Sequence, residues 1–319
     1  YAASGGQEGD TGIILAEVAP ERFEEFTVVD TKREQDKIIH FVPKGKEFPR
    51  QALSYILQVE TGKRKMTAAN HTATHLLQAV LRKLVGTHLH QAGSMVSKER
   101  LRFDFTHYEG LNDELLNKVE MEVNRLIFAA LPVVTEETDY QVAVNRGALA
   151  FFGEKYEQKV RMVQIGEVSL ELCGGTHVQN TSEILGFRII SEGSVATGVR
   201  RIEAVTGWEA LTLANQEKAL IKEMARELHT EPSQLGERVH ELLQEQVALK
   251  KTLEEMERKI ALAEGERMFA NVKVANGHKY LVSKMDQASI EVMRETVDRF
   301  KDKLESCVLL LGTVQGEKV

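Results

Sequence analysis

The first sixty residues alternate short apolar runs with turn residues. The runs at 12–15, 26–29 and 37–42 are rich in β-branched and aromatic side chains, as strands are. Gly5-Gly6 and Gly9-Asp10 are turn signals before the first of them. The pattern predicts a small β-barrel-like segment or sheet in residues 1–62.

From Met66 onward, the apolar residues recur with the spacing of an α-helix. A helix with Thr67 as its N-cap is predicted to run to Gly86, where glycine ends it. Its apolar stripe consists of Leu76, Leu77, Val80, Leu81 and Leu84. A second amphipathic helix is predicted over 112–130, before Pro132.

Strands are predicted around these helices. Residues 101–105 alternate cleanly between apolar and polar, as a half-buried strand does. Further strands are predicted at 133–138, 159–165, 168–172, 184–190 and 199–205. Helices combined with a largely antiparallel set of strands predict an α+β fold, with a sandwich in residues 63–207.

The third region begins with a helical pattern over 208–228. A seam follows in which the spacing alternates between four and three residues, as a coiled coil or helical hairpin requires. The seam consists of Leu235, Val239, Leu242, Gln246, Leu249, Leu253, Met256, Ile260 and Ala263. Residues 208–265 are therefore predicted to form a helical linker, in which the polar Gln246 is a candidate register device.

Beyond Gly265 the pattern changes to strands at 272–274, 280–282 and 308–311, with a helix at 287–304. Residues 266–319 are predicted to begin an α/β domain. The chain starts at Tyr1 without an initiator Met and stops just after a strand-like run. We therefore expect a fragment of a longer protein.

Composition narrows the class of protein. Hydrophobic residues make up 42% and charged residues 28%, as in ordinary globular proteins, and no apolar run reaches the length of a membrane span. The net charge of −7 gives no overall attraction to nucleic acid, so any RNA contact needs a local basic patch. Two cysteines, Cys173 and Cys307, exclude a disulfide framework and suit a reducing, cytoplasmic compartment.

Two pairs of metal-ligand residues stand out. His71 and His75 are four apart in a predicted helix, so both imidazoles lie on one face. Cys173 and His177 have the same separation, but Gly174-Gly175 between them favours a loop or helix start. Three imidazoles and one thiolate are a suitable donor set for a tetrahedral divalent ion, zinc first.

Other interpretations of these residues remain open. A lone histidine pair is more often a solvated face, and a lone cysteine more often a small buried hydrophobe. The metalloprotease pattern is excluded, because Thr72 follows His71 where a general-base glutamate would be needed. Since four protein ligands close a tetrahedral site, a purely structural zinc is the alternative to a catalytic one.

The motifs around these residues resemble alanyl-tRNA synthetases, in family order over about residues 1–207. The matching segments are Ser4-Gly5-Gly6-Gln7 with Gly9-Asp10-Thr11-Gly12, then residues 71–77, Gln91-Ala92-Gly93-Ser94, 101–105, 152–156, 173–177 and 198–207. Residues 208–319 are less specifically similar to the helical linker and the start of the C-terminal tRNA-binding and oligomerisation domain.

The resemblance implies an editing hydrolase that removes serine or glycine from mischarged tRNA(Ala), with Zn²⁺ held by His71, His75, Cys173 and His177. It also implies that Gln91 lies in the substrate pocket and that Thr11 hydrogen-bonds the serine hydroxyl. Arg102, Arg200 and Arg201 are candidate tRNA contacts. If 199–205 is a strand, the last two arginines face opposite sides.

Aminoacylation is not expected, because no segment resembles an ATP-binding core; in the family that domain would precede Tyr1. Three alternatives remain: a tRNA-binding module with a structural zinc, an oligomerisation element formed by the seam at 235–263, or a free-standing trans-editing protein. The related threonine enzyme shares the HxxxH and CxxxH ligands. Free-standing alanine-editing proteins also share the glycine-rich segment.

Overall fold

The computed structural model describes residues 1–319 except 36, 46, 151–156, 286–287, 305 and 314–319. The chain separates into two compact units, Tyr1–Lys218 and Ala219–Val319. Helix α4 (Gly207–Glu227) begins in the first unit and ends in the second. The finer division predicted from the sequence, with boundaries at 62, 207 and 265, stays a prediction.

The N-terminal strands form an open sheet and a separate ribbon. Strand β1 (Gly12–Ala19) pairs antiparallel with β2 (Arg22–Val28) and β5 (Tyr55–Val59), while β3 (Asp30–Glu34) pairs with β4 (Lys37–Phe41). Apolar side chains of β1 and β2 form a small core of their own. The strands described here do not close on themselves, so the barrel-like detail is not confirmed, whereas the mixed α+β class is.

The central element of the first unit is a four-stranded antiparallel sheet of order β11-β12-β7-β6. Its strands are β6 (Gln91–Val96), β7 (Leu101–Thr106), β11 (Phe187–Ala196) and β12 (Val199–Thr206). Phe103 and Phe105 on β7 are fully buried, while the residues between them are half-buried. This is the alternation that the sequence predicted for 101–105.

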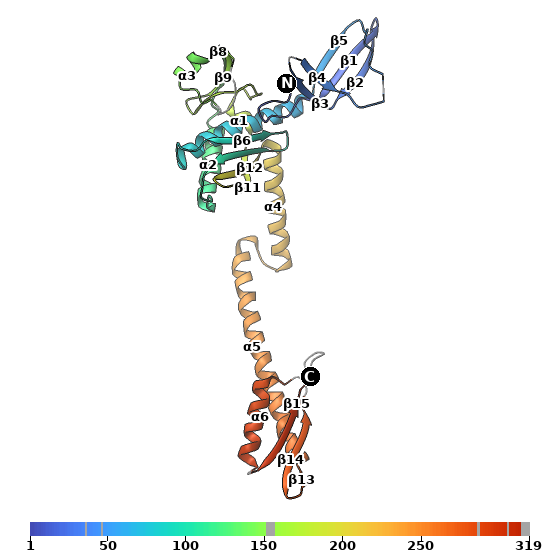
Figure 1. Ribbon diagram of the computed structural model, residues 1–319, viewed down its shortest axis with the longest axis vertical. Helices are drawn as coiled ribbons and strands as arrows, with labels where there is room; N and C mark the ends of the chain where they lie inside the picture. Colours follow the sequence, from blue (N-terminus) through green and yellow to red (C-terminus); the bar gives the residue numbers. More distant parts are fainter. Residues whose placement is uncertain (36, 46, 151–156, 286–287, 305, 314–319) are drawn as a thin grey trace. The chain divides into compact units, whose positions relative to one another are not determined.

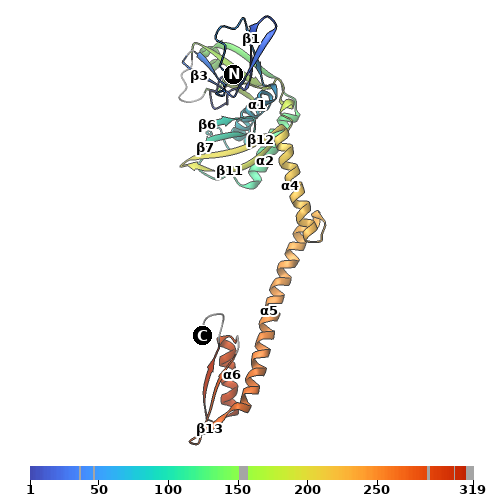
Figure 2. The same cartoon turned by 90° about the vertical axis from the view of Figure 1, so that its right-hand side faces the viewer.

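Two helices cover the buried face of this sheet (Figures 1 and 2). They are α1 (Thr61–Leu84) and α2 (Asp113–Phe128), and their apolar residues, among them Leu77 and Val123, join Phe103 in one core. The amide of Leu115 donates to the Asn112 side chain, which caps α2. Burial of these apolar stripes is the main stabilising contribution to this unit.

Helix α1 begins earlier than the sequence indicated. It starts at Thr61, so Thr67 lies inside the helix and not at its N-cap; the Thr67 hydroxyl donates to a Glu8 carboxylate oxygen at 3.2 Å. Residues 61–65, which form the first turn of α1, include no apolar side chain that could mark one face of a helix. The spacing of apolar residues therefore could not locate the start of this helix. From Thr67 to Leu81 nearly every residue is buried, and this stretch contains both histidines.

A second, three-stranded sheet of order β10-β9-β8 supplies the other half of the site. Its strands are β8 (Val133–Asp139), β9 (Lys159–Ile165) and β10 (Ser169–Leu172), with α3 (Tyr140–Asn145) and the 3-10 turn η1 (Thr181–Ile184) beside them. Strand β10 ends at Leu172, directly before Cys173. The loop with the second ligand pair therefore leaves from the end of a strand.

The second unit contains a long helix, α5 (Leu235–Met268), and a small α/β layer. Strand β14 (His278–Lys284) pairs antiparallel with β13 (Lys273–Ala275) and parallel with β15 (Cys307–Gly312). Helix α6 (Ile290–Lys303) and the end of α5 bury Leu281, Phe300 and Met268 against this sheet. The short turns η2 (Pro232–Gln234) and η3 (Phe269–Asn271) precede and follow α5.

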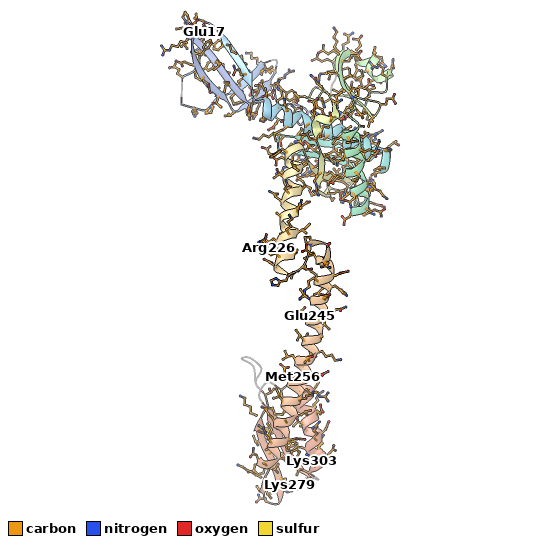
Figure 3. The ribbon with its side chains drawn as sticks, turned by 180° about the vertical axis from the view of Figure 1, so that it is seen from behind. Glu17, Arg226, Glu245, Met256, Lys279 and Lys303 are labelled. Atoms are coloured by element: carbon orange, nitrogen blue, oxygen red, sulfur yellow. The ribbon has the colours of Figure 1, made fainter. Side chains whose placement is uncertain are left out.

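The predicted seam lies on α5, but most of it is exposed. Leu249, Leu253, Met256 and Ile260 are between 56% and 69% exposed, and Figure 3 shows Met256 on this helix. Coiled-coil pairing is thus not confirmed in the described part of the chain. In the part of the chain that the structure describes, no helix is both long enough and apolar enough to span a membrane.

The core between the central sheet and its helices gives a stability prediction. Phe103→Ala removes a fully buried ring, so we expect a loss of about 3–5 kcal/mol in the free energy of unfolding of the first unit. Phe128→Ala is the matched control, because that ring is 91% exposed and its removal should change the value by less than about 0.5 kcal/mol. Urea unfolding followed by circular dichroism checks both; equal effects would contradict the assigned core.

Candidate metal centre

Four side chains that the sequence singled out come together at one point. Donor atoms of His71, His75, Cys173 and His177 all lie within 4.8 Å of one another. Cys173 Sγ is 3.4 Å from His71 Nε2 and 3.3 Å from His177 Nε2. Two segments about a hundred residues apart in the chain therefore form one cluster.

Helix α1 supplies the first pair, as its spacing predicted. His71 and His75 lie one turn apart on the buried face and are only 7% and 3% exposed. The second pair lies in the loop after β10, not in a helix, in agreement with the glycines between its ligands. The Arg161 guanidinium on β9 donates to the carbonyl oxygens of Cys173 and Gly175, which fixes the path of this loop.

Gly175 allows the loop to approach α1 closely. A Cβ atom at this position would lie 2.0 Å from Cε1 of His71 and 2.8 Å from Oε1 of Gln7. Both neighbours are buried, so neither can move aside without cost. At Gly174, by contrast, an added Cβ would meet nothing within 4 Å.

The outward-facing nitrogen of each histidine lies near an oxygen atom, and those of His71 and His177 are in hydrogen-bond geometry. His71 Nδ1 is 2.7 Å from Gln7 Oε1, His177 Nδ1 is 3.1 Å from Thr72 Oγ1, and His75 Nδ1 is 3.2 Å from Glu171 Oε2. The Thr72 hydroxyl already donates its hydrogen to the Ala68 carbonyl, so its oxygen accepts from His177. These contacts orient the rings and leave the Nε2 atoms to the cluster, as outer partners do in metal sites.

The residues fit a tetrahedral ion. With metal–nitrogen and metal–sulfur bonds of about 2.0 and 2.3 Å, a tetrahedral zinc needs nitrogen–sulfur separations of about 3.5 Å. The two separations from Sγ, 3.4 and 3.3 Å, are close to this value. The Gly175 amide also donates to Sγ at 3.4 Å, which stabilises a thiolate there.

Burial controls the charge of the ligands. It lowers the pKa of His71 and of His177 well below the usual histidine value, and the pKa of His75 to about 4, because imidazolium is poorly solvated there. Burial likewise raises the pKa of Glu171 to about 7. The three imidazoles are therefore neutral at neutral pH, the form that binds a metal.

A pocket of about 220 Å³ opens beside the cluster. His71, His75 and Cys173 form one wall, and Gln91, at the start of β6, is also in the lining. Its predicted role in a substrate pocket stays a prediction. The Gln91 side-chain amide donates to Ser94 Oγ at 3.2 Å. The complete lining is Tyr1, Ser4, Gly5, His71, Thr74, His75, Gln78, Gln91, Ser94, Leu172, Cys173, Gly174 and Gly175.

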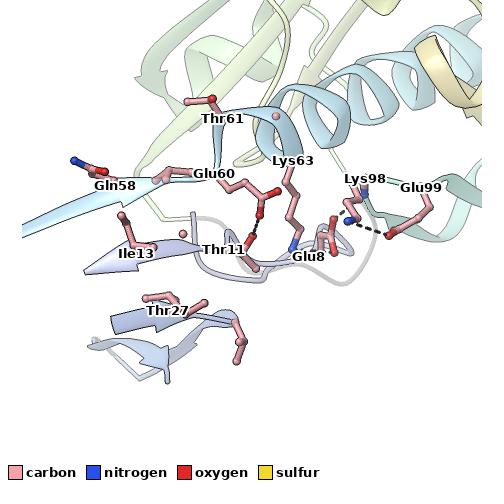
Figure 4. A pocket seen from close by; sticks show the side chains of 15 residues that line it. Glu8, Thr11, Ile13, Thr27, Gln58, Glu60, Thr61, Lys63, Lys98 and Glu99 are labelled. Atoms are coloured by element: carbon pink, nitrogen blue, oxygen red, sulfur yellow. Dashed lines mark hydrogen bonds and ion pairs between the residues drawn. The ribbon is translucent and has the colours of Figure 1, made fainter. Parts of the chain in front are cut away.

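Thr11 does not line this pocket. Its hydroxyl donates to Glu60 Oε2 at 2.7 Å, at the junction of β5 and α1, where it borders a larger and more open pocket (Figure 4). Lys63, Lys98 and Glu8 also line that pocket, with Lys63 and Glu8 close to Thr11 in Figure 4. The predicted contact of Thr11 with a serine hydroxyl stays a prediction.

The three candidate tRNA-contacting arginines lie on the central sheet beside carboxylates. Arg201 forms a two-pronged ion pair with Asp104, at 2.7 and 2.8 Å, and Arg102 Nε lies 3.9 Å from the same carboxylate. Arg200 is paired with Glu192 through two hydrogen bonds of 2.6 Å. Their predicted role in tRNA binding stays untested, and the motif at 152–156 lies outside the described residues.

Sequence reasoning missed the residues around the ligands: Gln7, Thr72, Glu171 and Arg161. No local periodicity marks them, because each acts on a ring or loop from another segment. Gln7 belongs to the glycine-rich motif and Thr72 to the ligand helix, so the motifs drew attention to these positions without indicating their contacts. For Glu171 the sequence did contain one signal, since this acidic residue is two positions before the candidate ligand Cys173.

Comparisons with known proteins place the chain beside tRNA synthetases. The model of the threonyl and alanyl tRNA synthetase second additional domain matches residues 160–203, which include Cys173 and His177. The chain is also 42% identical over 322 residues to an alanine–tRNA ligase of Oleidesulfovibrio alaskensis, and 43% identical over 319 residues to that of Alkaliphilus metalliredigens. It is 40% identical over 319 residues to the enzyme of Idiomarina loihiensis.

The chain is a homologue of alanine–tRNA ligases. Each of these matches covers 100% of this chain and 36% of the relative, so the chain spans about a third of the length of these ligases. The family recognised from the motifs is thereby confirmed. The N-terminal strands, α5 and the second unit fall within the matched region as well.

The two loop glycines give a test of the centre. Gly175→Ala places a methyl group against the His71 ring and Gln7, so we expect zinc binding to weaken at least about 100-fold. Gly174→Ala should bind zinc like the unmodified chain, because the space beside it is open. Titration with zinc against a chelating dye measures both affinities. Similar affinities for the two variants would contradict the assigned loop geometry.

Proposed function

We propose that the first unit hydrolyses the ester bond of tRNA(Ala) mischarged with serine or glycine. The observation that carries this proposal is the pocket of about 220 Å³ walled by His71, His75 and Cys173. Homology to alanine–tRNA ligases supports the choice of tRNA. The matched family model, shared by threonyl and alanyl synthetases, supports a domain common to both enzymes.

Alanine selection creates a need for such a site. A pocket sized for alanine cannot exclude glycine by size, and a hydroxyl group alone gives poor discrimination against serine. A second, hydrolytic site is the physical remedy for this limit. The described pocket is small and lined by amide and hydroxyl groups, among them Gln91, Ser94 and Thr74, which suits a small polar aminoacyl group.

We assign zinc to the cluster, held by His71, His75, Cys173 and His177. When bound there, a zinc ion supplies Lewis acidity or holds the substrate in place. Among the chain's own groups, Gln91 and Ser94 offer hydrogen bonds to the aminoacyl group. The wall formed by His71 and His75 is buried and restricts the access of bulk water. Selectivity follows if a serine hydroxyl satisfies a polar group that alanine leaves unpaired.

The wider assignments follow from homology. We propose that tRNA(Ala) contacts Arg102 and one of Arg200 and Arg201, which face opposite sides of β12. We also propose that the protein acts in the cytoplasm as part of an aminoacyl-tRNA synthetase. The exposed seam on α5 is the proposed site of homo-oligomer formation. The alternative is a tRNA-binding module, which the four protein ligands favour, because a site closed by protein has no free position for substrate.

Hydrolysis of Ser-tRNA(Ala), with Ala-tRNA(Ala) as the comparison ester, tests the proposal. We expect the chain to cleave the serine ester and spare the alanine ester. Cys173→Ala should lower cleavage at least about 100-fold and reduce bound zinc, because it removes the only sulfur ligand. Cys307→Ala is the matched control, since Cys307 lies in the second unit and should leave both properties unchanged. A chain that binds zinc but cleaves neither ester would establish the binding-module alternative.

The role of Gln91 is tested separately. Gln91→Met keeps the length of the side chain but removes its hydrogen bonds, so we expect kcat/KM for the serine ester to fall about tenfold. The zinc content should not change, because Gln91 is not among the four clustered ligands. An unchanged kcat/KM would exclude Gln91 from substrate recognition.

A further inference from the structure

Gln7 is a buried polar residue whose contacts extend beyond the outer nitrogen of His71. Its side chain is only 3% exposed and lies between helix α1 and the ligand loop. The Oε1 atom is 2.7 Å from His71 Nδ1 and accepts from the Thr176 amide at 2.9 Å. The Nε2 atom donates to Thr176 Oγ1 at 2.9 Å. One amide group therefore contacts both segments that carry the ligands.

These contacts fix the orientation of the amide. A backbone N–H can only donate, so the atom facing the Thr176 amide must be the oxygen. The same oxygen then accepts from His71, which places the ring hydrogen on Nδ1 and leaves Nε2 unprotonated. Nε2 is the His71 atom that lies 3.4 Å from Cys173 Sγ.

We propose that Gln7 is a positioning residue of the metal centre. It selects the tautomer of His71 that presents Nε2 to the ion, and it ties the ligand loop to α1 through Thr176. The proposal rests on metal binding by the cluster, the metal centre of the proposed function, but not on ester hydrolysis. A residue in this role is expected to contribute about 10–100-fold to metal affinity.

The segment that carries Gln7 is held by its backbone. Ser4 and Gln7 bond to each other across a tight turn, the Glu8 amide donates to the Val96 carbonyl, and the Val96 amide donates to the Gly6 carbonyl. Gly6 has a φ of +82°, and a Cβ there would lie 2.3 Å from the Ser94 carbonyl oxygen. The turn therefore docks against the end of β6 and directs Gln7 toward the cluster.

This arrangement couples metal binding to the docking of residues 4–8. A ligand that binds only the assembled cluster stabilises every element needed to assemble it. Gln7 is such an element, so a bound ion should hold the turn more firmly against β6. Amide hydrogen exchange in residues 4–8 should accordingly slow when zinc is added.

Two substitutions separate positioning from simple packing. Gln7→Met keeps the buried volume but removes every polar contact, so we expect zinc affinity to fall about 10–100-fold. Gln7→Glu keeps an acceptor for His71 Nδ1, in the carboxylate–histidine arrangement common in metal sites, and should recover most of the affinity. Gln58→Met is the matched control, because Gln58 is exposed on β5 and should leave the affinity unchanged.

The full chain and its variants are titrated with zinc and with cobalt(II) in competition with a chelator, without tRNA. The visible absorption of cobalt(II) reports whether the thiolate and imidazoles still bind together. If Gln7→Met binds both ions like the unmodified chain, Gln7 only fills space and the proposal is overturned. If that variant does not fold, Gln7→Glu and hydrogen exchange of the unmodified chain decide: exchange in residues 4–8 that zinc leaves unchanged would also overturn it.

The titration also separates this proposal from the proposed function. If zinc affinity depends on Gln7 but the chain cleaves no ester, the hydrolase proposal fails and the positioning role of Gln7 stands. If the chain cleaves the serine ester but its zinc affinity does not depend on Gln7, only the positioning role of Gln7 fails.

Discussion

The convergence of three imidazoles and one thiol at a single point, with His71 and His75 buried, is the constraint on which the first unit depends. Placing unpaired polar groups in a protein interior is costly, and three neighbouring rings add mutual repulsion whenever they are protonated. The chain offsets this cost at two outer nitrogens with hydrogen bonds to Gln7 and Thr72, and it places Glu171 Oε2 3.2 Å from the third. The inner nitrogens and the sulfur converge on one point, where a bound cation would stabilise the arrangement.

The rest of the unit can be understood as support for that point. The core of the central sheet holds α1 against β7 through residues such as Leu77 and Phe103, and α1 in turn fixes two ligands. Strand β10 and Arg161 on β9 deliver the other two from the opposite side. The glycine-rich turn at residues 4–7 completes the arrangement from the N-terminal segment, through Gln7.

Much of this was predictable from local pattern. The spacing of His71 and His75, the alternation at 101–105 and the glycines between Cys173 and His177 each follow from one segment alone, and the structure agrees with all three. Features that depend on contacts between distant segments were not predictable. Thr67 appeared to be a cap because the polar first turn of α1 has no apolar period, and β3 was missed because its residues, 30–34, are almost wholly polar. The heptad seam on α5 indicated which face of the helix is apolar but not what packs against it. The sequence also could not distinguish a closed barrel from an open sheet, because that depends on which strands pair.

The arginine pairs on the central sheet have a consequence for how RNA is attracted to it. Arg200 and Arg201 are each already joined to a carboxylate in a two-pronged ion pair, so each pair carries no net charge. From a distance such pairs exert little pull on a phosphate backbone, and the whole chain, at −7, repels it. These arginines would therefore add little to long-range attraction, and a phosphate could bind to either guanidinium group only by displacing its carboxylate.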